Sequence, residues 1–392
     1  MKRMMNIKQI LLLVAVICMG IFASCDDAKY DALDTHAYIG EALKSTGGDV
    51  TITKDTIVTL DILLSDVSER NNHYQLVVDQ ASLDEYNRKN GTSYVSMPEE
   101  VYKLSEDVVI EAGEYKVKDT IDIKAFTDEM NASGESYALP LRLVAKEGSV
   151  DAMPVTGSYI ITASSVFEFS APLFVNETPN LIADGFTESP ETYGEYTIEV
   201  RFQISNTNAR NRAVFSNNLD SSLDKILLRF EDPNSADPNH EKHSLVQIVG
   251  RNSIYLNPTR SFKPNKWQHL ALTCDGSSYR LYINGEPSGS IEIPGGPTTF
   301  SDVRWFSTAW GQCKILMSEA RIWSVVRTEL QIQNNMKIVS PNSPGLEAYW
   351  RFNEGEGTVF EDATGNGHTI ETSKKFSWVP KIKSTDESTP WP

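Results

Sequence analysis

The sequence is poor in cysteine and in positive charge, and it lacks an apolar run long enough to cross a membrane. Four cysteines in 392 residues exclude a small scaffold held together by disulfides. The 36 basic residues are outnumbered by 53 acidic ones, and the resulting charge of −17 argues against nucleic acid as a partner, because phosphates need a basic face. No stretch reaches the roughly 20 apolar residues of a membrane span. A hydrophobic content of 40% nevertheless excludes a largely disordered chain and suffices for two or three packed domains.

The first 25 residues have the pattern of a secretory signal. Basic residues come before an apolar run over residues 10–23, which is too short to span a bilayer comfortably. The string Phe22-Ala23-Ser24-Cys25 resembles the lipobox of bacterial lipoproteins, in which the chain is cleaved just before the cysteine and its thiol is acylated. The resemblance implies a lipoprotein signal peptide over residues 1–24 and a lipid anchor at Cys25. The alternative is an ordinary signal followed by an incidental cysteine.

Two acidic residues directly after this cysteine bear on where the protein is displayed. Asp26-Asp27 resembles the acidic export signal of surface lipoproteins from Gram-negative glycan degraders. We therefore expect a lipid-anchored protein of the outer membrane that faces the cell exterior. A plain solvated linker is the alternative interpretation of this dipeptide.

The chain beyond the signal divides into two parts of different charge. Residues 26–164 carry 26 acidic and 12 basic groups, whereas residues 165–392 carry 27 and 21. The difference supports two modules. In the first module, apolar and polar residues alternate over residues 58–64, 74–78, 121–125, 139–143 and 159–161, which is typical of half-buried strands. We predict a lipidated tether over residues 25–48 and an Ig-like β-sandwich over residues 49–164.

An ordered series of short motifs in the first module carries a family resemblance. The motifs are Val78-Asp79, Leu83–Asn87, Asn90–Tyr94, Met97-Pro98 and Tyr137–Leu141. This series, over about residues 35–163, resembles the N-terminal domain of unknown function found in surface lipoproteins that bind or process glycans, often ahead of family-18 endoglycosidases. The resemblance implies a spacer or support.

The second module, predicted over residues 165–383, carries a longer set of motifs. Asn284-Gly285 supplies the two residues with positive φ that a type I′ hairpin requires, and Thr328 is a suitable N-cap for a short helix. The segments Trp267–Thr273, Tyr279–Glu286, Met317–Trp323 and Gly345–Gly355 are similar, in their order, to those of laminin-G-like, concanavalin A-like jelly rolls. That family consists of two-sheet sandwiches that mostly bind carbohydrates or proteins, sometimes with calcium. The sequence thus predicts an all-β chain, an Ig-like sandwich followed by a concanavalin A-like sandwich, and then a tail over residues 384–392.

Two tryptophans of the second module are candidates for stacking on sugar rings. Trp305 and Trp310 lie outside the family motifs, unlike Trp267, Trp323 and Trp350, which we expect in the core. An indole in a glycine-containing loop offers a flat apolar face, and sugars present matching C–H faces. The alternative is an aromatic loop folded onto the edge of the sandwich.

Polar residues around an insert over residues 231–243 complete the expected carbohydrate site. Planar amides, carboxylates and guanidinium groups fix sugar hydroxyls, and loops at the end of a sandwich are where sites are often built. The candidates are Tyr255, Arg229, Asp232, His240 and Arg251. Each of them is also compatible with an ordinary solvated side chain.

Two further pairs have two interpretations each. Asp362 and Asn366, beside glycines, are suitable oxygen ligands for calcium, but they also fit a tight turn. Cys274 and Cys313 are the cysteines of the expected folded part of the chain, and outside the cytoplasm they either pair in a disulfide or remain as buried thiols.

Catalytic motifs are missing from the second module. The concanavalin A-like fold also houses family-16 glycosidases, which place two carboxylates about 5–5.5 Å apart on a Glu-x-Asp-x-x-Glu strand. That string is absent, as are the Asp-x-x-Asp-x-Asp-x-Glu motif of family-18 enzymes, a P-loop and a nucleophile motif. We therefore expect a non-catalytic protein that binds glycan and passes it to an outer-membrane importer or a neighbouring glycosidase. The alternative is a protein-binding or adhesion subunit.

Overall fold

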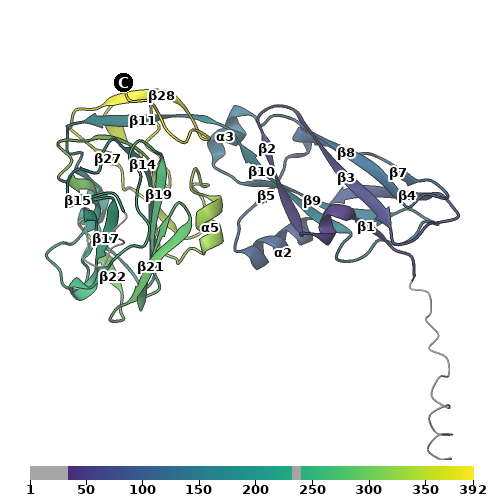
Figure 1. The fold of residues 1–392 in the computed structure, drawn as a ribbon, viewed down its shortest axis with the longest axis horizontal. Helices are drawn as coiled ribbons and strands as arrows, with labels where there is room; N and C mark the ends of the chain where they lie inside the picture. Colours follow the sequence, from purple (N-terminus) through teal and green to yellow (C-terminus); the bar gives the residue numbers. More distant parts are fainter. Residues whose placement is uncertain (1–33, 232–239) are drawn as a thin grey trace, which may run out of the picture.

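The computed structural model describes residues 34–231 and 240–392 and shows two β-sandwiches joined end to end (Figure 1). The predicted all-β fold class is confirmed. The signal peptide, Cys25 and Asp26-Asp27 lie outside the described residues, as does Asp232. In the described ranges no helix is long and apolar enough to cross a membrane.

The first sandwich consists of a four-stranded and a six-stranded sheet. The four-stranded sheet has the order β1 (Ala37–Ile39), β3 (Thr56–Leu64), β8 (Lys116–Ile123) and β6 (Tyr102–Lys103). The second sheet has the order β2 (Gly47–Ile52), β10 (Ser158–Ser165), β9 (Tyr137–Ala145), β4 (Asn72–Val78) and β7 (Val108–Ile110), with β5 (Val95–Ser96) paired to β9. Short helices connect them: η1 (Gly40–Leu43), α2 (Gln80–Asn90), η2 (Glu99–Val101) and α3 (Asp128–Ser133).

Alternation along the strands fills the core of this sandwich. In β3, Leu60, Ile62 and Leu64 are buried, whereas Ile57 and Thr59 are exposed on the other face of the strand. Ala37 and Ile39 of β1 belong to the same core, and β2 pairs in parallel with β10. The first sandwich therefore includes β1, so the expected boundary at residue 49 lies too far along the chain. The short β1 is hard to detect in the sequence because three residues carry almost no periodicity.

The second sandwich packs an eight-stranded sheet against a six-stranded one. The larger sheet has the order β21 (Glu286–Glu292), β20 (Ser278–Ile283), β19 (Gln268–Cys274), β14 (Tyr196–Ile204), β24 (Lys314–Trp323), β11 (Glu168–Val175) and β28 (Ser377–Lys383), with β25 (Leu346–Trp350) paired to β24. The smaller sheet has the order β12 (Leu181–Ile182), β23 (Arg304–Thr308), β15 (Arg212–Asn217), β16 (Ile226–Glu231), β17 (Leu245–Val249) and β18 (Tyr255–Leu256).

Smaller elements close the ends of this sandwich. They are two strand pairs, β13 (Glu191–Tyr193) with β22 (Thr298–Phe300) and β26 (Val359–Phe360) with β27 (Ile370–Glu371), and the helices α4 (Asp184–Glu188), η3 (Arg251–Ser253) and α5 (Glu329–Asn334). The β20–β21 hairpin turns at Asn284 and Gly285, which have φ of 52° and 77°. The predicted positive-φ turn is confirmed.

The last residues are part of the second sandwich and not a free tail. The indole Nε1 of Trp267 donates to Thr389 Oγ1 at 2.8 Å, and Gln203 Nε2 donates to the Thr389 carbonyl at 2.7 Å. The expected tail over residues 384–392 is therefore docked against the larger sheet. The sequence pattern of this segment is too short and polar to show that docking.

A buried ionic cluster lies on the outer face of the larger sheet. Glu199 is fully buried, and its carboxylate oxygens lie 2.8 Å from Arg321 Nη1 and 2.9 Å from Arg327 Nη1. The same two arginines donate to the carbonyl and the side-chain oxygen of Asn335, directly after α5. The cluster therefore fixes the segment that carries α5 onto the sheet.

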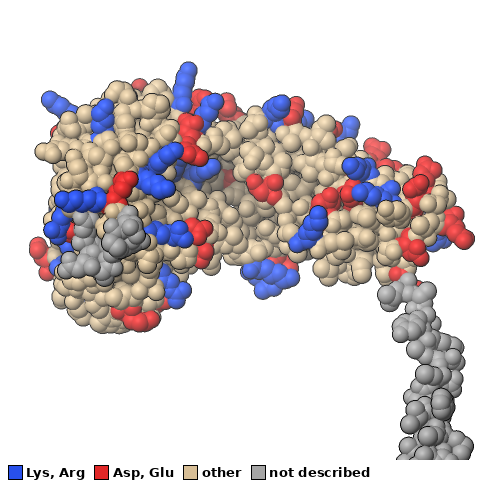
Figure 2. Space-filling model, in the orientation of Figure 1, with Lys and Arg blue, Asp and Glu red and all other residues tan. Residues whose placement is uncertain are grey.

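Charge is distributed unevenly over the surface. Figure 2 shows acidic side chains gathered at the far end of the first sandwich and basic ones spread over the second. This distribution agrees with the charge difference between the two modules. The net charge of the second sandwich is small, so charge alone does not indicate which ligand it binds.

Candidate functional site

The candidate site is the outer face of the six-stranded sheet in the second sandwich. On β16, Leu228 and Phe230 are buried in the core between the sheets. Because side chains alternate along a strand, Leu227, Arg229 and Glu231 point to the opposite face. This face carries several of the residues that the sequence nominates.

A row of planar polar groups crosses this face. Arg229 Nη1 donates to Asn211 Oδ1 at 2.9 Å, and Arg229 Nη2 donates to Gln247 Oε1 at 3.1 Å. Gln247 Nε2 donates in turn to Asn257 Oδ1 at 2.8 Å. The strand register produces the row, because Arg229 of β16 lies directly opposite Gln247 of β17. We call Asn211, Arg229, Gln247 and Asn257 the polar row.

Tyr255 stands at the edge of the sheet, next to the polar row. Its side chain is 49% exposed, although the residue pairs with Val249 on β17. Asn257, the last member of the polar row, is two residues further along and on the same face. An exposed phenol ring beside planar donors and acceptors is an arrangement that suits a sugar, which has both C–H faces and hydroxyl groups.

The side chain of Arg229 is 24% exposed, so part of its guanidinium group is accessible although both Nη atoms donate to neighbouring amides. Its Nε is buried and has no partner among the described residues. Glu231 Oε2 lies 3.7 Å from Arg229 Nη2, and the other oxygen of Glu231 binds Arg210. The positive charge of Arg229 is therefore partly balanced, which suits a neutral or weakly acidic ligand. His240 and His243 lie further along the chain and both have interaction partners.

Arg251 does not belong to this face. It is 4% exposed, and its Nη2 donates to the Gly296 carbonyl at 3.1 Å and to the Pro297 carbonyl. These bonds tie η3 to the segment before β22. The expected role of Arg251 in ligand binding is wrong, because its side chain is buried and a ligand on the outer face cannot reach it.

Trp305 and Trp310 are not accessible to a ligand either. Both are fully buried, and Trp310 Nε1 donates to the Ala213 carbonyl at 2.9 Å. Trp305 packs edge-on against Phe215, with 4.8 Å between ring centroids. The stacking role is wrong because these rings fill the core between the two sheets. Trp267, Trp323 and Trp350 are buried as well, which confirms that prediction.

The two cysteines are free, buried thiols. Cys274 lies opposite Tyr196 at one end of β14, and Cys313 contacts Ser205 at the other end. Nine residues of extended strand span about 30 Å. A disulfide needs Cα atoms within about 7 Å, so the pairing is wrong. Burial raises the pKa of the Cys274 thiol.

Asp362 organises a turn. Its Oδ1 accepts hydrogen bonds from the amides of Tyr349 and Thr364, and its Oδ2 accepts one from the His368 amide. Asn366 Nδ2 donates to the Glu347 carbonyl. The turn interpretation of this pair is therefore the one that the contacts support. Among the described residues, no group of three or more His, Cys, Asp or Glu is placed to hold a metal ion.

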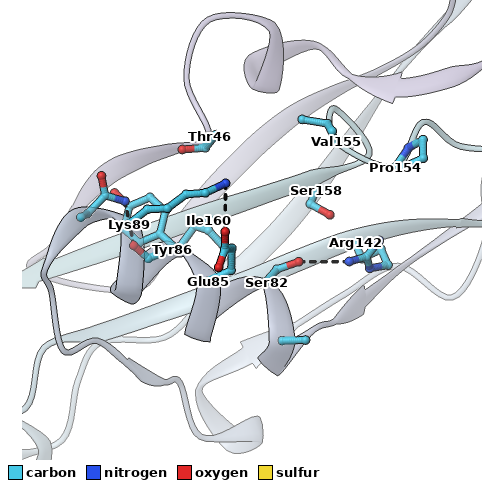
Figure 3. A pocket seen from close by; sticks show the side chains of 12 residues that line it. Thr46, Ser82, Glu85, Tyr86, Lys89, Arg142, Pro154, Val155, Ser158 and Ile160 are labelled. Carbon is cyan, nitrogen blue, oxygen red and sulfur yellow. Dashed lines mark hydrogen bonds and ion pairs between the residues drawn. The ribbon is translucent and has the colours of Figure 1, made fainter.

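A second concave surface lies on the first sandwich, where the sequence nominates nothing. A groove of about 290 Å³ lies between α2 and the residues before β10, and Figure 3 shows the side chains that line it. Its charged groups are paired, since Lys89 Nζ lies 3.1 Å from Glu85 and Arg142 Nη2 donates to Ser82 Oγ at 3.2 Å. The groove therefore offers mainly apolar surface, including Tyr86. The sequence feature that lies at this groove is the Leu83–Asn87 motif, but packing of the helix explains that motif equally well.

Comparisons with known proteins agree with this division into two modules. A family of N-terminal domains matches residues 33–150, and the concanavalin A-like lectin/glucanases superfamily matches residues 185–333. Human pappalysin-1 is 25% identical over 169 residues, which make up 36% of this chain and 10% of that protein. Mouse pappalysin-1 is 29% identical over 128 residues, or 29% of this chain and 7% of that protein. The chain thus spans a tenth or less of these curated relatives.

A solved structure covers both modules. It is a Bacteroides ovatus protein, provisionally described as carbohydrate-binding, with a TM-score of 0.52 and 23% identity over 88% of this chain and 99% of that chain. At this identity the likeness shows the fold. The chain therefore combines a domain of that N-terminal family with a second domain of the concanavalin A-like lectin/glucanases superfamily.

Proposed function

We propose that this protein is a cell-surface lipoprotein that binds oligosaccharide or polysaccharide on the outer face of the six-stranded sheet. The observation that carries the proposal is the exposed ring of Tyr255 beside the polar row. The superfamily of the second domain, which includes lectins, supports it. Recognition would combine stacking on Tyr255 with hydrogen bonds from Arg229 and the amides, and no bond of the glycan would be broken.

Affinity electrophoresis tests the binding. The soluble chain from residue 26 onward is run through gels containing α-mannan, xylan, arabinan or laminarin, and we expect retardation by at least one of them. Tyr255→Ala should weaken binding roughly tenfold, since an aromatic contact contributes on the order of 1 kcal/mol or more. Tyr115→Ala is the matched control, because Tyr115 is 51% exposed on the first sandwich. If both variants are retarded equally, or if the native chain is not retarded by any polysaccharide, the proposal is contradicted. Release of reducing sugar above background would contradict the non-catalytic part.

The anchor is tested in the cell. Cys25 follows a lipobox-like string, so Cys25→Ala should abolish lipidation and release the protein from the membrane fraction. Mass spectrometry of the N-terminal peptide and protease treatment of intact cells measure lipidation and display. A Cys25→Ala protein that stays with the outer membrane would exclude this anchor. Passing of bound glycan to an importer or a neighbouring glycosidase is the role that such a location would allow.

A further inference from the structure

Polar contacts join the two sandwiches at their junction. The chain passes from β10 to β11 with only Val166 and Phe167 between them. Beside this link, Arg351 Nη1 donates to the Ala132 carbonyl at 2.8 Å, and Ser340 Oγ donates to Glu135 Oε1 at 2.6 Å. Contacts across the junction thus concentrate on α3 and the residues that follow it.

A cleft of about 360 Å³ lies beside these contacts, with walls from both modules. The first sandwich contributes Tyr94, Asn131 and residues of β2, and the second contributes Gln333, Asn334 and Lys337, around the end of α5. We call this the interdomain cleft. Its volume falls within the range of small-molecule sites, which occur preferentially between domains.

The lining of the interdomain cleft combines amides with aromatic rings. Asn334 and Lys337 are exposed residues of the lining, and Tyr94 and Phe126 supply apolar surface. The side-chain Oδ1 of Asn131 is buried and accepts no hydrogen bond from the described residues. A buried acceptor without a partner is unfavourable, and a donor from a ligand or a water molecule would remove that cost.

The charges of the lining select a class of ligand. Lys337 supplies one positive charge, and the carboxylates of Asp49 and Glu135 supply two negative ones. A strongly anionic ligand is therefore disfavoured. Neutral hydroxyl groups suit the lining better, because each hydroxyl both donates and accepts a hydrogen bond.

We propose that the interdomain cleft is a second binding site, which holds a short run of neutral sugar residues between the two sandwiches. The proposal rests on the proposed function, since it takes the same class of ligand. It gives the first sandwich a direct part in binding, in addition to its expected role as a spacer. The glycan would contact α3 on one side and residues 333–337 on the other.

Hydrogen exchange of the native chain tests this site. The probes are mannopentaose, xylopentaose, arabinopentaose and laminaripentaose, each added singly to the chain from residue 26 onward. We expect at least one of them to protect amides both in α3 and in residues 333–338. Protection confined to β16–β18 would overturn the interdomain cleft while leaving the proposed function in place. Absence of binding by every probe and every polysaccharide would overturn both.

Variants of the lining give the second measurement. Asn334→Ala combined with Lys337→Ala should weaken binding of the protecting probe roughly tenfold, because two hydrogen bonds to the ligand are lost. Lys54→Ala, an exposed lysine of the first sandwich, is the control and should bind like the native chain. Asn131→Leu, which removes the unpaired acceptor together with the hydrogen bond from Asn131 Nδ2 to the Phe126 carbonyl, should also weaken binding, and its thermal unfolding midpoint shows whether the variant is folded. Unchanged affinity in both lining variants would overturn the site.

Discussion

Glu199 is a buried carboxylate of the second sandwich with arginine nitrogens on both of its oxygens. Burial opposes its ionisation, yet the neighbouring Arg327 and Arg321 and the nearby His269 hold the pKa of Glu199 well below its ordinary value. A buried charge that loses its partner is costly, whereas the intact pair is roughly neutral for stability. A substitution of Glu199 therefore measures how much the stability of the protein depends on the whole ionic cluster.

We predict that Glu199→Gln lowers the free energy of unfolding by about 3–5 kcal/mol at neutral pH, because Arg327 loses its counter-charge and Arg321 keeps only Glu319. Because the folded pKa is lowered, the contribution of Glu199 is complete above the unfolded pKa near 4.3 and is lost as the pH falls towards the folded pKa. Urea unfolding at several pH values measures this. The difference in the free energy of unfolding between the native chain and the variant should shrink below about pH 4.3. A difference that stays constant there would contradict the prediction.

At the scale of elements, α5 begins with a capping box. Thr328 Oγ1 accepts from the Gln331 amide at 3.2 Å, and Gln331 Oε1 accepts from the Thr328 amide at 2.8 Å. The helix has only six residues, so these bonds make up much of its local support. The same helix contributes Gln333 and Asn334 to the interdomain cleft.

We predict that Thr328→Ala destabilises the protein by about 1 kcal/mol, because the Gln331 amide loses its acceptor. Thr328→Ser keeps the hydroxyl and should lose only a few tenths of that amount. Chemical unfolding followed by tryptophan fluorescence measures both variants. An equal loss in the serine and alanine variants would show that the hydroxyl is not what matters at this position.

The elements that could be predicted from the sequence are those with a local signal. β3 shows its alternation over nine residues, and Asn284-Gly285 shows its turn through two residue types. The site was predicted only in part. Arg229 and Tyr255 lie on one face, but Trp305, Trp310 and Arg251 are buried. Whether an aromatic or an arginine in a loop turns inward depends on packing between two sheets, which no local pattern encodes.

At the scale of the whole molecule, Gly134 fits a close approach between the two sandwiches. Its φ is 77°, and a Cβ atom there would lie 2.1 Å from the Val339 carbonyl oxygen of the second sandwich. Gly113 has a φ of 86° in the first sandwich, and a Cβ atom there would meet nothing within 4 Å. Both positions strain a residue with a side chain, but only Gly134 faces the junction. The junction could not be predicted from sequence because it joins segments about 200 residues apart.

We predict that Gly134→Ala separates the two sandwiches, whereas Gly113→Ala does not. Small-angle X-ray scattering should show a larger radius of gyration for Gly134→Ala alone, because the new methyl group collides with the Val339 carbonyl. Both variants should lose a similar, small amount of stability through backbone strain. Scattering curves that coincide for the two variants would contradict a close-packed junction at this glycine.

The parallel pairing of β2 with β10 has a mechanical consequence. If the chain is tethered at Cys25 and a polymer is held on the second sandwich, tension enters at the N-terminal side and leaves at Ser165, the end of β10. Tension reaches β1 first, and once β1 has detached from β3 the N-terminal end of β2 and the C-terminal end of β10 are pulled in opposite directions along the same axis. The six residue pairs between them, from Gly47 opposite Ile160 to Ile52 opposite Ser165, would share the load together instead of opening one after another. Under such a load, the β2–β10 pairing would resist stretching of the first sandwich.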